Sequence, residues 1–375
     1  MKSTHPASLG LASAMLLGLV AALGACEKKE EPKPTTSATT GTGAAATEPK
    51  KEEEVKIDRA LLVQFGKLPD LFASSDNPIT KEKVELGRTL FFDPRISKNQ
   101  DVSCNSCHDL AKSGADGLAT SEGHRKQHGK RNSPTVYNSA GQFVQFWDGR
   151  AKNVEEQALG PALNPVEMAM PDGATVMKVL TSMPKYVEAF KAAFPADKNP
   201  ATFENFGKAL GAFERTLVLP SKFDQYLAGD DDALSNPEKV GLKKFMDLTC
   251  SSCHAGPLLG GMEYQKLGKV KPWEKTNDLG RYDVTKQESD KLMFKTPGLR
   301  NVAKTAPYYH DGSVATLEEA VKLMGTHQVG MAFSDQDTKS IVTFLKTLSG
   351  EPKPAMMAKP ELPPSTPKTP KPDPR

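Results

Sequence analysis

One short cysteine motif, present twice, constrains this chain more than any other feature of its sequence. Cys-X-X-Cys-His occurs at residues 104–108 (CNSCH) and 250–254 (CSSCH), and this is the pattern to which haem c is attached. Two thiols three residues apart lie close together on one helical turn, where they can form thioethers to the two vinyl groups of one haem. The histidine that follows then reaches the iron. We therefore expect two haem c groups, with thioethers at Cys104, Cys107, Cys250 and Cys253 and iron ligation by His108 and His254.

A zinc site is the alternative interpretation of such motifs, because thiolates and neutral imidazoles are both zinc ligands. A histidine directly after the second cysteine is awkward for zinc, and exported proteins rarely depend on reduced thiols. A set of disulfides is also disfavoured. The fifth cysteine, Cys26, has a separate explanation in the N-terminal segment, so four cysteines remain for two haems.

The N-terminal segment is typical of an exported protein. Residues 9–23 are uncharged and follow Lys2, and the run is too short to span a bilayer comfortably. The sequence then continues Leu-Gly-Ala-Cys26, which resembles a bacterial lipoprotein signal, although an ordinary secreted protein is the alternative. We predict a signal peptide over residues 1–25, lipidation of Cys26, and an anchor on the periplasmic side of the outer membrane, which Glu27 favours.

Composition separates two polar tails from a globular body. Residues 26–57 and 351–375 are rich in Lys and Pro and hold little to bury, so we expect a disordered tether and an unpacked tail. The body divides into a predicted N-terminal domain at 58–220 and a C-terminal domain at 221–350. With 375 residues, 38% of them hydrophobic, the chain is long enough for two cores.

Charge and breaker residues narrow the class further. The net charge of +3 comes from 49 Lys and Arg against 46 Asp and Glu, with no basic stripe that would indicate nucleic acid binding. The 29 Pro and 29 Gly residues indicate many breaks between short elements. Helical spacing of apolar residues in GKALGAFERTL and EEAVKLMGTH predicts a mainly α fold.

The segments after the two motifs echo each other. Arg131-Asn132 is matched by Arg300-Asn301, and FWDG at 146–149 is matched by YHDG at 309–312. The sequences VEEQALGP and LEEAVKLM then follow in the two halves. The repeat predicts two related helical haem domains.

The two halves differ at one chemically important position. When the two halves are aligned without gaps from the match of FWDG with YHDG, Met324 falls opposite Pro161. A methionine thioether makes a closed, electron-transferring haem, whereas proline cannot ligate iron. The first haem must therefore find another sixth ligand or leave that position open, and His124 in a Gly-rich loop could supply a mobile ligand.

Over residues 58–350 the chain resembles the bacterial di-haem cytochrome c peroxidases. The resemblance rests on CNSCHDL, DGLATSEGH, RNSPTVYN, QFWDGR, EEQALGP, NPVEMAM, CSSCH, FKTPGLRN and TAPYYHDG. It implies that the first haem is the peroxidatic one and that the second, at higher potential, receives electrons. It also implies reduction of hydrogen peroxide with electrons from a small periplasmic cytochrome c or cupredoxin, and a homodimer. Membrane contact would come through the lipid anchor alone.

The resemblance assigns distal ligands and a proton-transfer residue. It makes His124 the distal ligand of the first haem, with His128 as its competitor, and Met324 that of the second, with His327 and Met331 as competitors. It makes Glu167 the acid–base residue over the first haem, where peroxide cleavage needs a group that moves a proton between the two oxygens.

The resemblance also assigns supporting residues. It places Gln157 beside Glu167, with a helix-surface role as the alternative, and Trp147 between the haems, where it would shorten the electron path or simply pack the interface. It implies a calcium ion held by Asn132 and the backbone carbonyls of Thr305 and Pro307, an oxygen set that suits a hard cation. We expect His310 near a haem propionate or the domain interface.

Two other functions remain open at this stage. A non-enzymatic di-haem electron carrier would keep both haems six-coordinate. A di-haem oxidase of the kind that matures a protein-derived tryptophan quinone uses Tyr where Met324 stands here, which argues against it.

Overall fold

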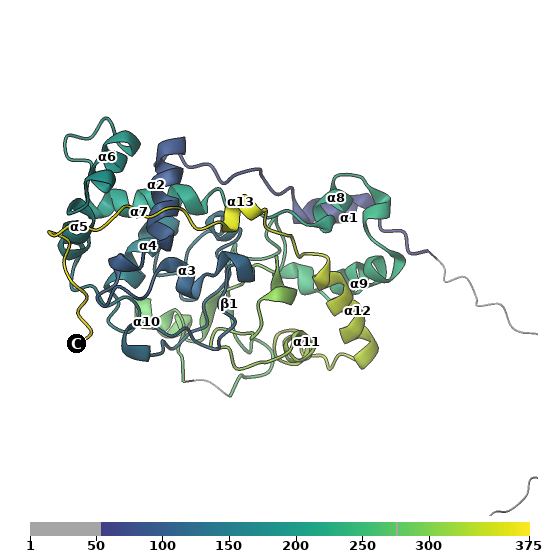
Figure 1. Ribbon diagram of the computed structural model, residues 1–375. Helices are drawn as coiled ribbons and strands as arrows, with labels where there is room; N and C mark the ends of the chain where they lie inside the picture. The colour runs from purple at the N-terminus through teal and green to yellow at the C-terminus, as the bar shows by residue number, and fades with distance from the viewer. Residues whose placement is uncertain (1–53, 275–276) are drawn as a thin grey trace, which may run out of the picture. The chain divides into compact units, whose positions relative to one another are not determined.

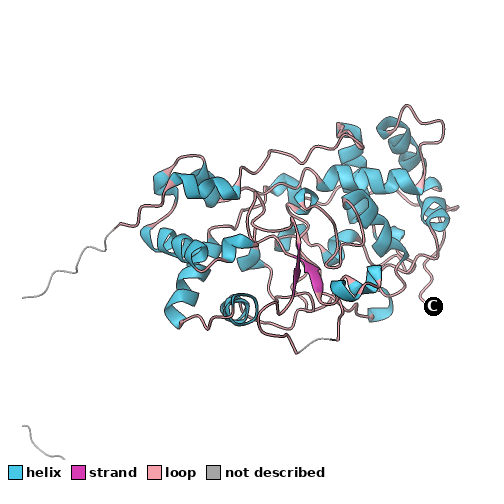
Figure 2. Ribbon diagram, turned by 180° about the vertical axis from the view of Figure 1, so that it is seen from behind, coloured by secondary structure: helices cyan, strands magenta, loops and turns pink. Residues whose placement is uncertain are grey.

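The computed structural model describes residues 54–274 and 277–375. The predicted signal peptide, Cys26 and the tether up to residue 53 lie outside the described residues. In the described ranges no helix is both long and apolar enough to cross a membrane. Helices dominate the fold, and a single two-stranded antiparallel sheet appears in the part that the structure describes, which confirms the mainly α prediction (Figure 2).

The elements are short and separated by turns, as the Pro and Gly content predicts. Ser, Thr, Asn or Asp side chains cap many of the helices; Asn153 and Thr316, for example, accept backbone N–H bonds of 3.0 and 3.2 Å at α4 and α11. The elements labelled in Figure 1 are α1 (Arg59–Leu62), α2 (Lys81–Phe92), α3 (Cys104–Cys107), α4 (Val154–Leu163), α5 (Gly173–Thr181), α6 (Pro184–Ala193), α7 (Phe203–Glu214), α8 (Lys222–Leu227), α9 (Asn236–Asp247), β1 (Tyr264–Lys266), α10 (Tyr282–Thr285), α11 (Leu317–Met324), α12 (Asp335–Lys346) and α13 (Pro354–Met357). The strand that pairs with β1 is β2 (Met293–Lys295).

The same helix crossing is built twice. Helices α2 and α7 approach closely at Gly87, where an added Cβ would lie 1.9 Å from the Ala209 carbonyl oxygen. Helices α9 and α12 do the same at Gly241, where an added Cβ would lie 2.1 Å from the Ser340 carbonyl oxygen. A glycine is required at both crossings because any side chain would push the helices apart.

The loops after the haem motifs also repeat, and they correct the alignment of the two halves. Asn138 and Asn301 both adopt a left-handed backbone (φ +62° and +60°), and each side-chain oxygen accepts a backbone N–H bond of 2.9 Å, from Leu219 and Gly350 respectively. The counterpart of Asn301 is therefore Asn138, not Asn132. The shared Arg-Asn dipeptide misled the sequence alignment.

The later part of the repeat is confirmed by matching bridges. Gln145 pairs with Ala151 as Tyr308 pairs with Val314, each through an N–H···O bond of 2.7 Å. The same number of residues separates these pairs as separates Asn138 from Asn301. Helices α4 and α11 occupy equivalent places in the two halves, which keeps Pro161 opposite Met324.

Two large hydrophobic clusters form most of the core of the described residues, and Leu68, Val218 and Leu258 form a small third one. The first runs through residues 86–219 and the second through residues 223–348. Leu62 and Phe65 belong to the second cluster, with the Phe65 ring 5.4 Å from that of Phe223. Helix α1 and the turn that follows it, which the sequence analysis grouped with the N-terminal domain, therefore pack with the second half, whereas Asn77, nearer α2, donates to Glu155 and to the Lys208 carbonyl oxygen of the first half.

The C-terminal tail is packed, contrary to the sequence prediction. Met357 and Leu362 lie against the first cluster. Further along, Thr366 Oγ1 donates to the Ser182 carbonyl (2.9 Å), and Thr369 is 7% exposed. Proline keeps this segment extended, but threonine hydroxyls and backbone groups still find partners on the body.

Candidate active site

Both haem motifs carry reduced, partly buried cysteines. The first forms α3, and its cysteines and those of the second motif are free of disulfides. Burial raises the pKa of Cys107 to about 11 and that of Cys250 to about 12, so both thiols are protonated at neutral pH. The cysteines of each motif are thus available as free thiols for addition to the vinyl groups of a haem.

The histidines of the two motifs are oriented in the same way. His108 Nδ1 lies 3.0 Å from the Pro134 carbonyl oxygen, and His254 Nδ1 lies 3.1 Å from that of Leu259. A carbonyl can only accept a hydrogen bond, so Nδ1 carries the hydrogen and Nε2 keeps its lone pair. Burial lowers the pKa of both rings, which favours the neutral form that binds metal. These residues therefore fit two haem c groups, each with a histidine presented by Nε2.

The loop that carries His124 is folded directly onto the segment that carries Glu167. The His124 backbone N–H donates to the Glu167 carbonyl oxygen at 2.6 Å. An added Cβ on Gly123 would lie 2.2 Å from the Val166 carbonyl oxygen, so only glycine permits this approach. The structure thus brings together two residues that are 43 positions apart in sequence.

Burial separates His124 from its competitor His128. The His124 side chain is 4% exposed, and its Nδ1 is buried without a hydrogen-bond partner among the described residues. His128 is exposed, and its Nδ1 lies 3.0 Å from the Thr120 carbonyl oxygen. A buried ring nitrogen without a partner is costly unless a ligand satisfies the ring, so the geometry favours His124 as the iron ligand.

Glu167 has the environment of a proton-transfer group. Burial raises the pKa of its carboxyl above the ordinary value, and the charge of Arg150 and a 2.8 Å hydrogen bond from Asn164 Nδ2 oppose that shift. Its charge acts on the Cys107 thiol and raises the pKa of that thiol. The carboxyl therefore lies near the first haem motif.

In the second half, Met324 ends α11 and packs, half-buried, against the cluster that also contacts Cys250. Its competitors are engaged or exposed. His327 Nδ1 lies 3.0 Å from the Lys271 carbonyl oxygen, and its ring packs against Trp273 at 4.9 Å. Met331 is 50% exposed. Met324 is thus the best placed of the three for a ligand role.

Trp147 belongs to the first half but packs against the second cluster. Its indole Nε1 donates to the Asn132 carbonyl oxygen (2.9 Å), and its ring meets that of His310 edge to face with centroids 6.5 Å apart. The Asn132 N–H in turn donates to the His310 carbonyl oxygen (2.8 Å). Trp147 and His310 are therefore held together through Asn132, and His310 is buried beside the Trp147 ring.

Known proteins of similar sequence are di-haem peroxidases, in agreement with the two haem motifs. The family model for di-haem cytochrome c peroxidase matches residues 81–232. The chain is 48% identical over 301 residues to the cytochrome c551 peroxidase of Pseudomonas aeruginosa, covering 79% of this chain and 86% of that protein. The cytochrome c551 peroxidase of Nitrosomonas europaea is also 48% identical, over 296 residues, covering 78% of this chain and 87% of that protein.

This chain belongs to the di-haem cytochrome c peroxidase family. A solved structure of a MauG-like protein associated with microbial copper homeostasis superposes with a TM-score of 0.71 at 28% identity, covering 79% of this chain and 97% of that one. The family carries two haem c groups, in agreement with the two motifs.

Other site residues that the peroxidase family resemblance assigned are placed less closely. Gln157 lies half-buried on α4, and its side chain makes no hydrogen bond to the described residues. Asn132 Nδ2 donates to the Leu118 carbonyl oxygen at 2.9 Å. Residues 117–119 also approach Ala306 and Gly312, so Asn132 lies in the neighbourhood of Thr305 and Pro307. Residues 54–274 and 277–375 hold no cluster of three His, Cys, Asp or Glu side chains suited to a metal. Calcium would need amide and carbonyl oxygens.

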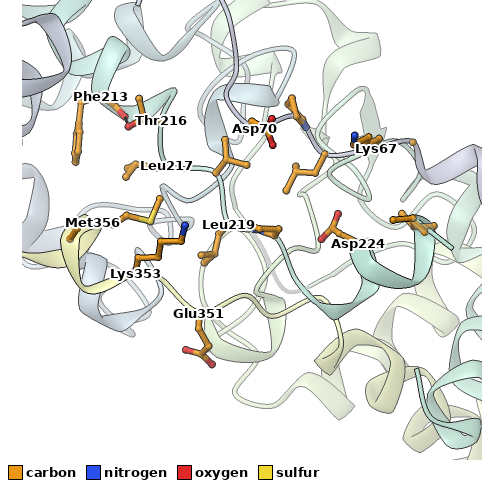
Figure 3. A pocket seen from close by; sticks show the side chains of 18 of the residues that line it. Lys67, Asp70, Phe213, Thr216, Leu217, Leu219, Asp224, Glu351, Lys353 and Met356 are labelled. Carbon is orange, nitrogen blue, oxygen red and sulfur yellow. Dashed lines mark hydrogen bonds between the residues drawn. The ribbon is translucent and has the colours of Figure 1, made fainter. Parts of the chain in front are cut away.

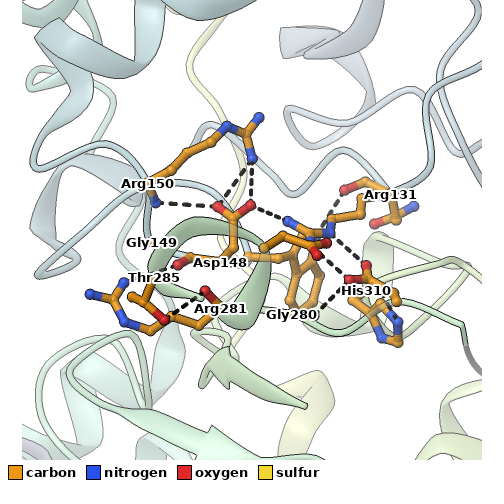
Figure 4. A network of polar contacts seen from close by, with 12 residues as sticks. Arg131, Asp148, Gly149, Arg150, Gly280, Arg281, Thr285 and His310 are labelled. Carbon is orange, nitrogen blue, oxygen red and sulfur yellow. Dashed lines mark hydrogen bonds and ion pairs between the residues drawn. The ribbon is translucent and has the colours of Figure 1, made fainter. Parts of the chain in front are cut away.

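A network of charges around Trp147 was missed by the sequence analysis. Arg131 donates to Asp148 at 2.5 Å and to both carboxylate oxygens of Asp278 at 2.6 and 2.7 Å (Figure 4). Arg150 binds the same Asp148, and Arg281 Nη1 donates to the Asp148 carbonyl oxygen at 3.1 Å. The network joins the residues flanking Trp147 to the second half. No sequence signal pointed to it, because Asp278 lies outside every motif.

The large pocket of the peroxidase is not its haem site. It encloses about 1240 Å³ and is lined by residues 59–70, 213–220 and 351–356, together with parts of α2 and α8. Leu217, Leu219, Lys353 and Met356 surround it in Figure 3. No residue of either haem motif lines it, so pocket size alone would have pointed to the wrong place.

Proposed function

We propose that this chain reduces hydrogen peroxide to water at its first half, with electrons that a small c-type cytochrome or a cupredoxin delivers to the second half. The observation that carries the proposal is the contact between the His124 loop and the Glu167 segment beside the first haem motif. Peroxide reduction needs an iron position that can open and a proton-transfer group beside it. An electron carrier, with both haems six-coordinate, lacks such a position.

The protein groups divide the chemistry among them. Peroxide takes up two electrons and two protons, its O–O bond breaks, and two waters leave. When bound, the haem supplies the redox chemistry at iron. The Glu167 carboxylate takes a proton from one peroxide oxygen and returns it to the other, so that the departing oxygen leaves as water and not as hydroxide. Asn164 Nδ2 holds this carboxylate in place at 2.8 Å.

The His124 loop has the features of a movable ligand. After His124, both Arg125 and Lys126 adopt left-handed backbone conformations (φ +57° and +58°), which cost energy for residues other than glycine. A change in the conformation of this loop would relieve part of that backbone cost when the ligand leaves. The second half differs, because Met324 is the last residue of α11 and is followed directly by a π-helical turn at Gly325–Val329.

Removing the His124 ligand is expected to free the first haem. The oxidised His124→Ala variant should react with peroxide without prior reduction, and its optical spectrum should differ from that of the parent protein. Stopped-flow mixing of oxidised protein with peroxide measures this. His128→Ala is the matched control and should behave like the parent. If His128→Ala alone reproduces the effect, His128 is the ligand.

The proposed function is tested by peroxide turnover with a reduced cytochrome c as donor, measured on fully oxidised and on half-reduced protein. We expect turnover, with the half-reduced form reacting at once. An electron carrier would show negligible turnover in both states. Oxidation of a protein tryptophan in place of a small donor would indicate the quinone-maturing oxidase, against which Met324 argues.

The setting of the enzyme is part of the proposal. Residues 1–25 would direct export, and Cys26 would carry lipid at the periplasmic side of the outer membrane. Mass spectrometry of the N-terminal peptide of the mature protein tests both.

Calcium at Asn132, Thr305 and Pro307 would brace the two halves, and removal of calcium by a chelator should then lower activity reversibly. A homodimer is expected and is measured by sedimentation.

A further inference from the structure

A buried lysine ties the Trp147 loop to the second half. Lys295 is the last residue of β2 and is 5% exposed. Its Nζ donates to Gln142 Oε1 and, at 3.1 Å, to the Val144 carbonyl oxygen. Gln142 and Val144 belong to the first half and lie just before Trp147 in the chain.

The backbone of Lys295 holds the same loop. Its N–H donates to the Trp147 carbonyl oxygen at 2.8 Å. One residue therefore holds the loop at its beginning through the side chain and at Trp147 through the main chain. A neighbouring bond from the Phe143 N–H to the Gly261 carbonyl oxygen (2.9 Å) runs in parallel.

The residues after Lys295 lead to the second haem motif. The Thr296 carbonyl oxygen accepts the Gly261 N–H at 2.7 Å. An added Cβ on Gly260 would lie 2.2 Å from the Pro297 carbonyl oxygen and 3.1 Å from His254 Nδ1. The chain from Lys295 to Pro297 thus runs from Trp147 to Gly260, which lies against the His254 ring.

A lysine is a costly choice for this buried position. Burial lowers its pKa to about 7, because the ammonium loses water that the protein replaces only in part. A methionine of similar length would avoid this cost but would leave the Val144 carbonyl and Gln142 without a donor. Both the charged and the neutral amine keep N–H donors, so the contacts persist in either state.

We propose that Lys295 is a positioning residue for electron transfer between the two halves, because it fixes Trp147 relative to the segment behind His254. The inference rests on the proposed function, in which one electron leaves the second haem for the first in each peroxide reduction. Lys295 touches neither peroxide nor the reacting atoms. It acts through the placement of Trp147.

The test compares Lys295→Met and Lys295→Arg in the holoprotein. Half-reduced protein is mixed with peroxide, and reoxidation of the second haem is followed by absorbance. Lys295→Met should slow this step roughly tenfold, since small displacements of a positioned group have effects of this size or larger. Amide hydrogen exchange at residues 142–149 should rise in the same variant. Lys295→Arg, which keeps a donor, should recover part of the rate.

Two further comparisons separate positioning from general damage. Lys291→Met removes a surface lysine of the same segment, paired with Glu288 at 2.7 Å, and should leave the rate and exchange unchanged. Trp147→Phe should slow the transfer by itself, and adding Lys295→Met to it should slow it little further, because both changes act on one path.

The outcomes distinguish this inference from the proposed function. If Lys295→Met leaves both the transfer rate and the exchange of residues 142–149 unchanged while peroxide is still reduced, the positioning role is wrong and the peroxidase function stands. If the parent protein reduces no peroxide, the proposed function fails, and the exchange measurement still decides whether Lys295 holds the loop. Additive losses in the double variant would show that Lys295 acts apart from Trp147.

Discussion

Glu167→Gln is expected to lower peroxide turnover by a factor of about 10² to 10⁴, the usual contribution of a positioned acid–base group. Glutamine keeps the size and hydrogen-bonding capacity of the side chain but cannot carry the proton between the two peroxide oxygens. The spectra of both haems and the reduction of the second haem by the donor should stay as in the parent protein. Steady-state turnover and optical spectra measure the two effects.

The surroundings of Glu167 also predict the pH dependence of turnover. The carboxylate form accepts the first proton, so activity falls as the pH drops through the pKa of Glu167, which burial places above its ordinary value. Asn164 lowers that pKa through its hydrogen bond. Asn164→Ala should therefore move the acid limb of the pH profile to higher pH.

A matched control is available on the surface. Glu188 is exposed on α6, and Glu188→Gln should leave turnover and its pH profile unchanged. Full activity in Glu167→Gln would remove this residue from the mechanism. Loss of activity together with loss of the haem spectra would show that the substitution had damaged the site and not the proton transfer.

Arg131→Met is expected to destabilise the protein by about 3 kcal/mol, because it removes the cation of buried ion pairs and leaves their carboxylates in place. The side chains of Arg131, Asp148 and Asp278 are 16%, 6% and 14% exposed. Arg150 remains on Asp148, which keeps the expected loss near the lower end of the range for buried pairs. Denaturant unfolding of the holoprotein at neutral pH measures the change.

The effect of Arg131→Met should shrink in acid. Burial alone would raise the pKa of Asp278, but the hydrogen bonds from Arg131 and the Gly280 N–H, with the charges of Arg131 and His310, together hold the pKa below its ordinary value. The stability from this pair is therefore present above the unfolded pKa of about 3.9 and is lost as the pH falls through the folded pKa. The difference between parent and variant should narrow over that window.

Arg150→Met provides the control for Arg131. Arg150 binds the same Asp148, but its side chain is 42% exposed, so its ion pair should contribute less than about 1 kcal/mol. Equal losses in the two variants would mean that burial does not set the strength of this network. A small loss in Arg131→Met would have the same meaning.

Much of the site follows from local spacing in the sequence. The two Cys-X-X-Cys-His motifs specify two covalent haems because thioether formation and iron ligation need only residues within one or two turns. The echo of FWDG in YHDG placed Pro161 opposite Met324, and the matching helices α4 and α11 support that pairing. Helix content followed from the spacing of apolar residues and the frequency of breakers.

Contacts between segments far apart in the sequence could not be predicted from local sequence patterns. The Arg-Asn dipeptide at 131–132 looked like the partner of 300–301, but left-handed backbone geometry identifies Asn138 as the counterpart of Asn301. The tail after residue 350 was expected to be unpacked from its composition, and hydroxyl and backbone hydrogen bonds hold it to the body.

The sequence by itself determined the chemistry that the chain can carry: two haem c groups, with a proline in the first half at the position that a methionine takes in the second. Only the tertiary structure decided which groups act together, because burial and long-range contact are properties of the packed chain. It buried His124 and left His128 in solvent, set Glu167 beside the His124 loop, and placed Lys295 and Arg131 around Trp147. The spacing of residues along the chain determines the ligands within a motif, whereas packing determines which other residues surround those ligands.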